Sequence, residues 1–247
     1  MTSTFANRVL LVLGTLIGLF AGNCVYATSF TVAPTRIPLS DKQRAITVRL
    51  LNTGDDPVTV QARVIAWTLS ENKDAYHDSD DVLLNPPIFN LEPGKPQLMR
   101  LGLRHPVAQA TEIAYRLIVE EVPPPPKKGE VVLRTILRIS IPIFVAPQGD
   151  ARKQVDWKAE AISGGGIKIT ATNNGNLHLQ IKKLDLMPEG SSGAPSTKKM
   201  LDYLLPGQTR EWIFEEAELQ TAVKLSLTAL TDAGNFSASL SLDPTSR

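Results

Sequence analysis

Cysteine is nearly absent from this chain, because its 247 residues contain a single one, Cys24. That cysteine falls within residues 1–27, which we predict to be removed as a signal peptide. The mature chain then has no thiol, which excludes disulfide bonds and thiolate chemistry. An exported protein of this kind relies on apolar burial and hydrogen bonding for its stability.

Long apolar runs are also lacking, apart from one near the N-terminus. Arg8 precedes an apolar stretch from Val9 to Leu19, and Val25-Tyr26-Ala27 places small residues at both positions that a signal peptidase recognises. The stretch is too short to span a membrane comfortably. We therefore expect export followed by cleavage after Ala27.

Neither charge sign is in excess. The 26 lysine and arginine residues nearly balance the 25 aspartate and glutamate residues. No overall field would attract nucleic acid or an anionic membrane, so any charge-dependent function has to be local.

The usual enzymatic signatures are missing. The sequence contains no HExxH, GxSxG, P-loop or GxGxxG pattern, and its three histidines fall in predicted loops or strand ends without metal-ligand spacing. Neighbouring carboxylates such as Glu120 and Glu121 would point to opposite faces of a strand and cannot form an acid/base pair by themselves. We therefore expect no enzymatic activity and no cofactor or metal.

One acidic segment, residues 70–81, invites a different interpretation. Its Asp74, His77 and Asp78 could be metal ligands, as could Asp80 and Asp81. A calcium loop, however, requires a central glycine and a closing glutamate, which are absent here. We predict a solvated loop.

What the chain does have is a succession of short segments with strand-like alternation and turn signals between them. Between residues 29 and 147 we predict seven strands, at 29–39, 44–51, 58–69, 82–91, 97–103, 114–122 and 131–145. That number and spacing are typical of an immunoglobulin-like sandwich. A Pro/Gly linker, Ala146 to Asp150, precedes a second set of short strands. We predict an all-β protein with two immunoglobulin-like β-sandwich domains, residues 28–147 and 148–247, joined by a short hinge.

The stretch from Val131 to Val145 is the most informative. Its odd positions are apolar except for Thr135, whereas its even positions include Arg134, Arg138 and Pro142. Pro142 lacks a ladder donor, which favours an edge strand. From the residues alone two alternatives stay open: an ordinary core strand, or an edge left free for a partner's strand.

Several motifs together give the mature chain a resemblance to a known family. They are PIFNLEPGKPQLMRL, the YRL and EEVPP strings between Tyr115 and Pro124, ISIPIFVAP, NNGNLHLQI and YLLPGQTREW. In order and spacing they resemble the periplasmic chaperones of the chaperone/usher pilus pathway, across nearly all of residues 29–242. The RISIPIFV end is most similar to the archaic branch, which is associated with spore-coat-U-type subunits.

The resemblance implies a boomerang-shaped molecule and donor-strand complementation, a form of β-strand addition. A pilus subunit lacks one strand of its sandwich, and the chaperone lends its own. Here the lent strand would be the stretch described above, with Leu133, Thr135, Leu137 and Ile139 filling successive pockets. Pilus subunits and an outer-membrane usher are the partners that the resemblance implies.

The resemblance also implies a site for the subunit's C-terminal carboxylate, formed by an arginine and a lysine. Arg36 matches the arginine, but the lysine position is Pro142, and we expect Arg116 to replace it because a guanidinium can bind a carboxylate through two hydrogen bonds. Glu112 and Asp232 match the acidic members of the family's interdomain cluster, whereas the linker arginine is Ala146.

Two other functions would leave different features in the sequence. A structural pilus subunit or adhesin would carry an N-terminal donor extension, and the first predicted strand follows too closely after Ala27 to allow one. An exported hydrolase would need a converging acid/base pair, which the sequence does not indicate. The proline-rich segment from Pro123 to Lys128 either contacts an usher or covers a sheet edge.

Overall fold

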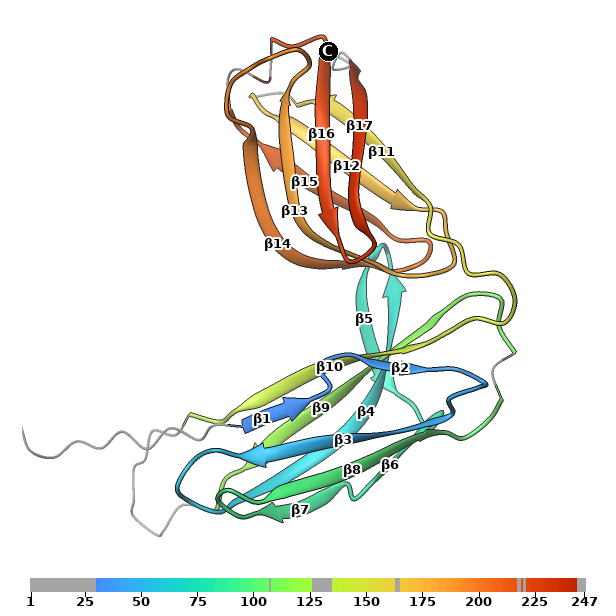
Figure 1. Ribbon diagram of the computed structural model, residues 1–247, viewed down its shortest axis with the longest axis vertical. Coiled ribbons are helices and arrows are strands. Elements are labelled where there is room, and N and C mark those ends of the chain that lie inside the picture. The colour runs from blue at the N-terminus through green and yellow to red at the C-terminus, as the bar shows by residue number, and fades with distance from the viewer. Residues whose placement is uncertain are drawn as a thin grey trace, which may run out of the picture.

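The computed structural model contains two β domains arranged end to end, as Figure 1 shows. It describes residues 30–106, 108–125, 135–162, 165–216, 219 and 221–243. The first domain contains β1 to β10 and the second β11 to β17. No helix in the described part of the chain is long and apolar enough to cross a membrane.

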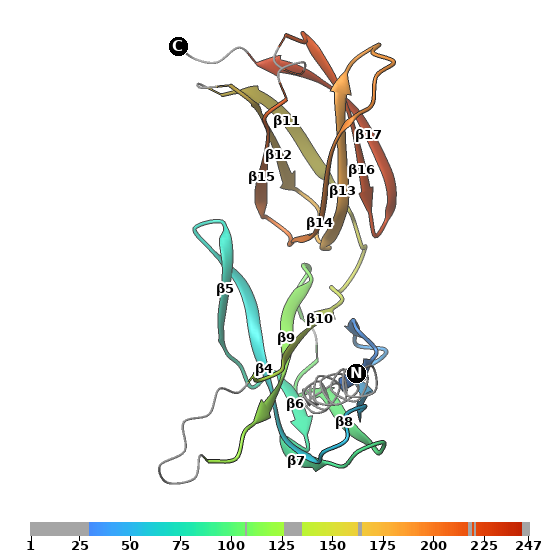
Figure 2. The same ribbon diagram turned by 90° about the vertical axis from the view of Figure 1, so that its left-hand side faces the viewer.

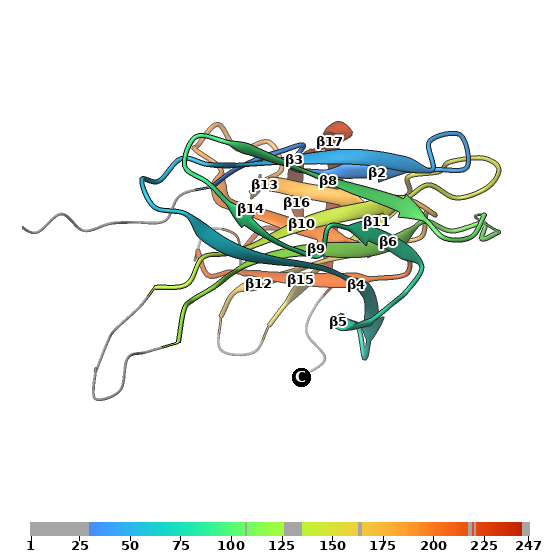
Figure 3. The same cartoon turned by 90° about the horizontal axis from the view of Figure 1, so that it is seen from below.

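The first domain is a sandwich of two sheets. One has the strand order β1-β3-β8-β6, and the other has the order β2-β10-β9-β4-β5, with β7 also paired to β4. The strand bounds are β1 Phe30–Ala33, β2 Ile37–Leu39, β3 Ala45–Asn52, β4 Val58–Ser70, β5 Lys73–Asp78, β6 Val82–Asn85, β7 Ile88–Leu91, β8 Pro96–Leu103, β9 Ile113–Val122 and β10 Arg138–Val145. Figure 3 views the molecule from the end formed by this domain.

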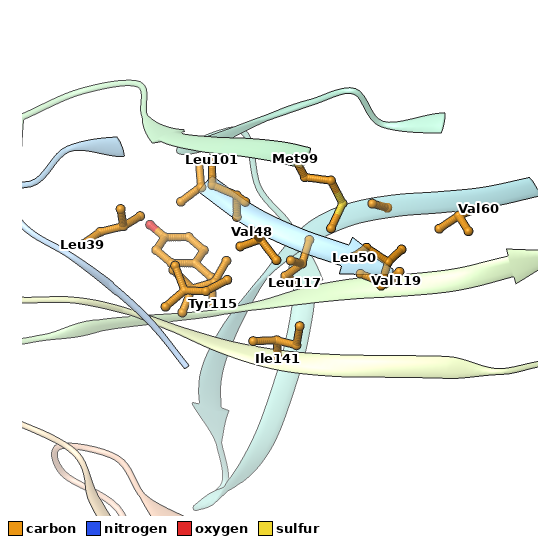
Figure 4. Packing of buried hydrophobic residues seen from close by; sticks show 14 of the residues in the cluster. Leu39, Val48, Leu50, Val60, Met99, Leu101, Tyr115, Leu117, Val119 and Ile141 are labelled. Carbon is orange, nitrogen blue, oxygen red and sulfur yellow. The ribbon is translucent and has the colours of Figure 1, made fainter. Parts of the chain in front are cut away.

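The core of the first domain lies between these sheets. Figure 4 shows Val48 and Leu50 of β3 and Met99 and Leu101 of β8 facing Leu117 of β9. All five side chains are fully buried. Alternate residues of each strand face inwards, as the period-2 pattern predicts.

Prolines divide two of the predicted strands. The segment 29–39 forms β1 and β2, which lie in different sheets on either side of Pro34, and the segment 82–91 is divided at Pro86-Pro87 into β6 and β7. A proline has no N–H for a ladder, so a change of sheet at these positions leaves no donor unpaired.

The prediction of a solvated loop at residues 70–81 is wrong. Residues Lys73–Asp78 form β5, which pairs with the far end of β4 as a long hairpin. Its turn residues Glu71 and Asn72 have φ angles of 48° and 62°, as a two-residue type I′ turn requires. The hairpin extends beyond the core, where a strand can be polar on both faces.

The second domain has its own core. Its strands are β11 Val155–Ala161, β12 Ile167–Asn173, β13 Leu179–Pro188, β14 Ser196–Leu204, β15 Thr209–Phe214, β16 Lys224–Thr231 and β17 Gly234–Asp243. They follow the order β14-β13-β16-β17-β11-β12-β15, which folds around Ile169, Ile181, Phe214 and Leu227, all fully buried. Figure 2 shows this domain above the β4–β5 hairpin.

Each domain contains a buried asparagine at a strand end. Asn52 ends β3 and Asn173 ends β12, and both are almost completely buried. The Asn173 side-chain nitrogen donates to the carbonyls of Leu177 and Leu204, and its oxygen accepts the N–H of Gly175. Asn52 makes the equivalent three bonds in the first domain. In each sandwich, one asparagine side chain thus provides hydrogen bonds to backbone groups at a strand end that have no ladder partner.

Asn173→Ala is expected to lower the free energy of unfolding by roughly 1–3 kcal/mol, because buried carbonyl groups lose their donor. Urea denaturation followed by circular dichroism measures the change. Asn174→Ala is the matched control, because its side chain binds Asp156 at the surface, and it should change the value by less than about 0.5 kcal/mol. Equal effects of the two substitutions would contradict a stabilising function of the buried amide.

Candidate functional site: an open strand edge beside two arginines

The strand β10 has a partner along one side only for most of its length. On one side it pairs with β9 from Arg138 to Val145. On the other side β2 pairs in parallel with only its last three residues, Ile143, Phe144 and Val145. From Arg138 to Pro142, this second side has no partner strand among the described residues.

The direction of the backbone groups on the open side follows from one hydrogen bond. The N–H of Glu121 donates to the carbonyl of Leu137 over 3.0 Å. Odd residues of β10 therefore bond to β9, and even residues point their N–H and C=O groups to the open side. Arg138 and Ser140 present both groups there, whereas Pro142 presents only a carbonyl.

The side chains expected to fill a partner's groove lie along this edge. Leu137 and Ile139 are half-buried, and Ile139 packs against the core of the first domain. Thr135 is exposed. Leu133 lies outside the described residues, as do the other residues from 126 to 134.

Arg116 lies at the middle of β9, directly opposite Pro142 of β10 and Ile65 of β4. Residues opposite each other share a sheet face, so Arg116 lies on the same face as the position where the family has its lysine. Its guanidinium carbon is 3.7 Å from the ring centroid of Trp67 and 5.5 Å from that of Tyr203 in the second domain.

The positive charge of Arg116 has no carboxylate within ion-pair distance among the described residues. Its Nε is buried without a hydrogen bond, and no ion pair joins it to an acidic residue in the part of the chain that the structure describes. Burial lowers the pKa of Arg116, although nearby Tyr76, Tyr203 and Asp74 partly oppose this effect. An arginine remains charged at neutral pH, so this side chain is a half-buried cation whose Nε has no hydrogen bond.

Arg36, just before β2, contacts the second domain. Its Nη1 donates to Asp232 over 3.0 Å and its Nη2 to Gln180 over 2.8 Å. Its guanidinium carbon is 5.7 Å from the Tyr203 ring centroid. Both expected anchor residues therefore lie against the same aromatic ring.

Glu112 and Asp232 lie where the domains meet. Glu112 accepts two hydrogen bonds from His178, one from its backbone N–H and one from Nδ1. The His178 ring stacks on Phe144 of β10 with 3.5 Å between centroids. Ala146, at the family's linker-arginine position, contributes a backbone N–H to Leu39.

The surroundings of Asp232 favour the ionised form of its carboxyl group. Burial alone would raise its pKa, but the Gln180 amide and the charges of Lys153 and Arg36 outweigh burial and hold the pKa below its usual value. The shift shows that the junction favours the ionised carboxylate.

Sequence reasoning missed several residues of this region. His178, Tyr203 and Arg210 fall within the quoted motifs NNGNLHLQI and YLLPGQTREW, but nothing in those strings shows which residues they meet in the other domain. Trp67 of β4 and Phe144 of β10 belong to a small cluster with Leu205 of the second domain, which alternation along a strand does not reveal. The motifs marked the right segments without giving the partners.

The acidic segment has a structural function. The described residues contain no group of three or more metal-ligating side chains. Asp81 accepts a hydrogen bond from the Tyr115 hydroxyl over 3.0 Å. Burial and this carboxylate raise the pKa of Tyr115. Tyr115 and Asp81 line a pocket of about 340 Å³ together with His77 and His105.

Comparison with known proteins agrees with this architecture. The family model described as "Pili and flagellar-assembly chaperone, PapD N-terminal domain" matches residues 29–150. A fimbrial chaperone of Bordetella pertussis, FimB/FhaD, is 30% identical over 67% of this chain and 71% of its own length. The chaperone MrkB of Klebsiella pneumoniae is 25% identical over 64% of this chain and 70% of its own.

A solved structure shares the fold. It is the complex of the chaperone CsuC with the tip subunit CsuE, from archaic chaperone-usher pili of Acinetobacter baumannii. Its matching chain is 23% identical, with a TM-score of 0.64 over 87% of this chain and 99% of that one. The two-sandwich fold and the sequence relatives lead to one conclusion: the chain belongs to the family of periplasmic chaperones that assemble pili and fimbriae.

Proposed function

We propose that this chaperone binds unassembled pilus subunits by donor-strand complementation, using the open edge of β10, and delivers them to an outer-membrane usher. The observation that carries the proposal is the half-paired β10, in which Arg138 and Ser140 have backbone groups without a partner strand among the described residues, beside the apolar side chains Leu137 and Ile139. An unpaired edge with an apolar row next to it is what an incomplete β-sandwich can accept as its missing strand.

The free energy for capture comes from burial and from main-chain hydrogen bonds. Each apolar side chain that passes from water into a subunit groove contributes about 1.5–3 kcal/mol before association costs are subtracted. No cofactor or catalytic step is needed, because an incompletely packed subunit can later exchange this strand for that of another subunit.

Arg116 is proposed as the principal anchor for the subunit's C-terminal carboxylate. The open ladder loses its N–H donor at Pro142, and Arg116 lies directly opposite that residue with an Nε that has no hydrogen bond. A guest strand that ends there cannot accept a hydrogen bond from Pro142. Its terminal carboxylate would accept a charge-assisted hydrogen bond from Arg116 in its place. Such a strand approaches from the Leu137 side and so runs parallel to β10.

Arg36 is proposed as the second anchor. It uses Nη1 and Nη2 for one bond each, and its side chain is 36% exposed, so several of its five N–H donors remain for a carboxylate. Glu112 and Asp232 are proposed to hold the domains so that Arg36 and Arg116 stay close to the end of the open edge. The family relationship supports a chaperone rather than a structural pilus subunit or adhesin. The partners expected are pilins of the spore-coat-U type.

Leu137→Asp is expected to abolish stable capture. Loss of one buried leucine weakens binding at least about tenfold, and an unpaired buried charge weakens it further. The measurement is co-purification of the chaperone with the pilin encoded in the same gene cluster after periplasmic co-expression.

The matched control is Leu98→Asp, an exposed leucine on β8 of the other sheet. It should leave the one-to-one complex intact. Equal recovery of pilin with Leu137→Asp and with the unmodified chaperone would contradict donor-strand complementation through β10.

Arg116→Ala is expected to weaken capture by about 10- to 100-fold, because a charge-assisted hydrogen bond contributes roughly 1.5–3 kcal/mol. Arg36→Ala should have a smaller effect in the same direction. Both effects should vanish with a pilin whose C-terminus is extended by a short polar tail, because its carboxylate is displaced.

Arg63→Ala, on the same face of the neighbouring strand β4, serves as the control for Arg116 and should bind normally. An effect of Arg116→Ala that is equally large with the extended pilin would show that the arginine stabilises the chaperone rather than the carboxylate.

The junction predicts a pH dependence. The pKa of Asp232 is lower in the folded protein than its usual value of 3.8. Its stabilising effect is therefore complete above that value and is lost as pH falls towards the lower, folded pKa. Thermal unfolding of the unmodified protein and of Asp232→Asn should differ most near neutral pH, and the difference should shrink below about pH 4. A difference independent of pH would show that the charge of Asp232 contributes nothing.

A further inference from the structure

The β4–β5 hairpin connects the two domains at a second place. At its tip, the Asn72 side chain donates to the Thr209 carbonyl over 2.6 Å and accepts the Thr209 N–H over 2.7 Å. Two residues further, Asp74 accepts bonds of 2.9 and 2.7 Å from Nη2 of Arg210 and one of 3.1 Å from Gln208. Figure 2 shows the hairpin reaching the lower end of the second domain.

Arg210 joins this contact to another strand of the second domain. Its Nε donates to the backbone carbonyl of Tyr203 on β14 over 2.8 Å, while its Nη2 holds Asp74. A guanidinium is planar and its donors have a fixed relative geometry. The position of the hairpin is therefore transmitted to the backbone of Tyr203 by a single rigid group.

The Tyr203 ring projects back towards the first domain. Its centroid lies 5.4 Å from that of Trp67, edge to face, and 5.5 Å from that of Phe144. The guanidinium carbons of Arg36 and Arg116 lie 5.7 and 5.5 Å from the same ring. One side chain of the second domain thus lies close to both proposed anchor arginines and to the two aromatic rings beside them.

We infer that Tyr203 is a specificity-determining residue for the subunit's C-terminus and that Asp74 and Arg210 are positioning residues that hold its ring in place. This inference rests on the proposed function, because it concerns the same carboxylate site. The ring is half-buried, and it limits how a terminal carboxylate approaches the two arginines.

The alternative is that the hairpin contributes only stability to the domain junction. In that case the Asn72–Thr209 contact and the Asp74–Arg210 contact are equivalent, because both join the same two elements. Only the Asp74–Arg210 contact extends to Tyr203, because Arg210 also binds the Tyr203 carbonyl. This difference gives a matched pair of variants.

The test variant is Asp74→Asn combined with Arg210→Met. It removes the Arg210–Tyr203 hydrogen bond and removes one negative and one positive charge together. The charge of Asp74 acts on Arg116, so this pairing keeps the net charge near Arg116 unchanged. The control is Asn72→Ala, which removes the other half of the hairpin contact. Tyr203→Leu is made alone and in combination with the test variant. The probe is a synthetic peptide of the C-terminal strand of the co-encoded pilin, as free acid and as amide, measured by calorimetry.

Tyr203→Leu and the test variant should each weaken binding of the free acid by about 5- to 20-fold, a usual range for coupling between sites. Neither should affect the amide, and combining them should add no further loss. Asn72→Ala should lower thermal stability to a similar extent as the test variant but change binding less than twofold.

Three results would overturn the inference: normal binding of the free acid by Tyr203→Leu, additive losses in the combined variant, or equal binding losses in Asn72→Ala and the test variant. If the unmodified chaperone binds acid and amide equally, the carboxylate site itself is disproved, and the inference with it. Calorimetry on the unmodified protein therefore separates failure of the proposed function from failure of Tyr203 as its determinant.

Discussion

The alternation of side chains along β10 is the constraint on which the rest of the structure depends. Ile139, Ile141 and Ile143 face the core of the first domain, which fixes the strand in its sheet. Phe144 faces the other way, beneath His178 and beside Leu205 of the second domain. Because one strand contributes to both, an error of one residue in its register would disrupt the core and the domain junction together.

The chemistry of the site follows from where that strand stops being paired. Backbone groups are satisfied by β9 on one side and, near the linker, by β2 on the other. From Arg138 to Pro142 the second side has no partner strand among the described residues, and Arg116, opposite Pro142, has no ion-pair partner among them. Main-chain groups and apolar side chains therefore alternate along the open edge, and a cation lies at its end. A guest strand would need the first two along its length and the cation at its terminal carboxylate.

The sequence predicted the fold well where alternation was regular. The segments 44–51 and 114–122 are within a residue or two of β3 and β9, and the two-sandwich architecture is confirmed. It failed at residues 70–81, because polar composition indicates a loop whereas a hairpin outside the core needs no apolar face. The expected donor residue Leu133 lies outside the described residues. The contacts of Arg36 could not be derived either, since its partners Gln180 and Asp232 are 144 and 196 positions away.

The short parallel pairing of β2 with Ile143, Phe144 and Val145 bears on how many different subunits one chaperone could bind. A strand that slides along β10 towards the linker meets β2 and cannot advance past it. The barrier is made of backbone and does not depend on the guest's side chains. Under the proposed mechanism, subunits with different sequences would therefore stop at the same residue of β10.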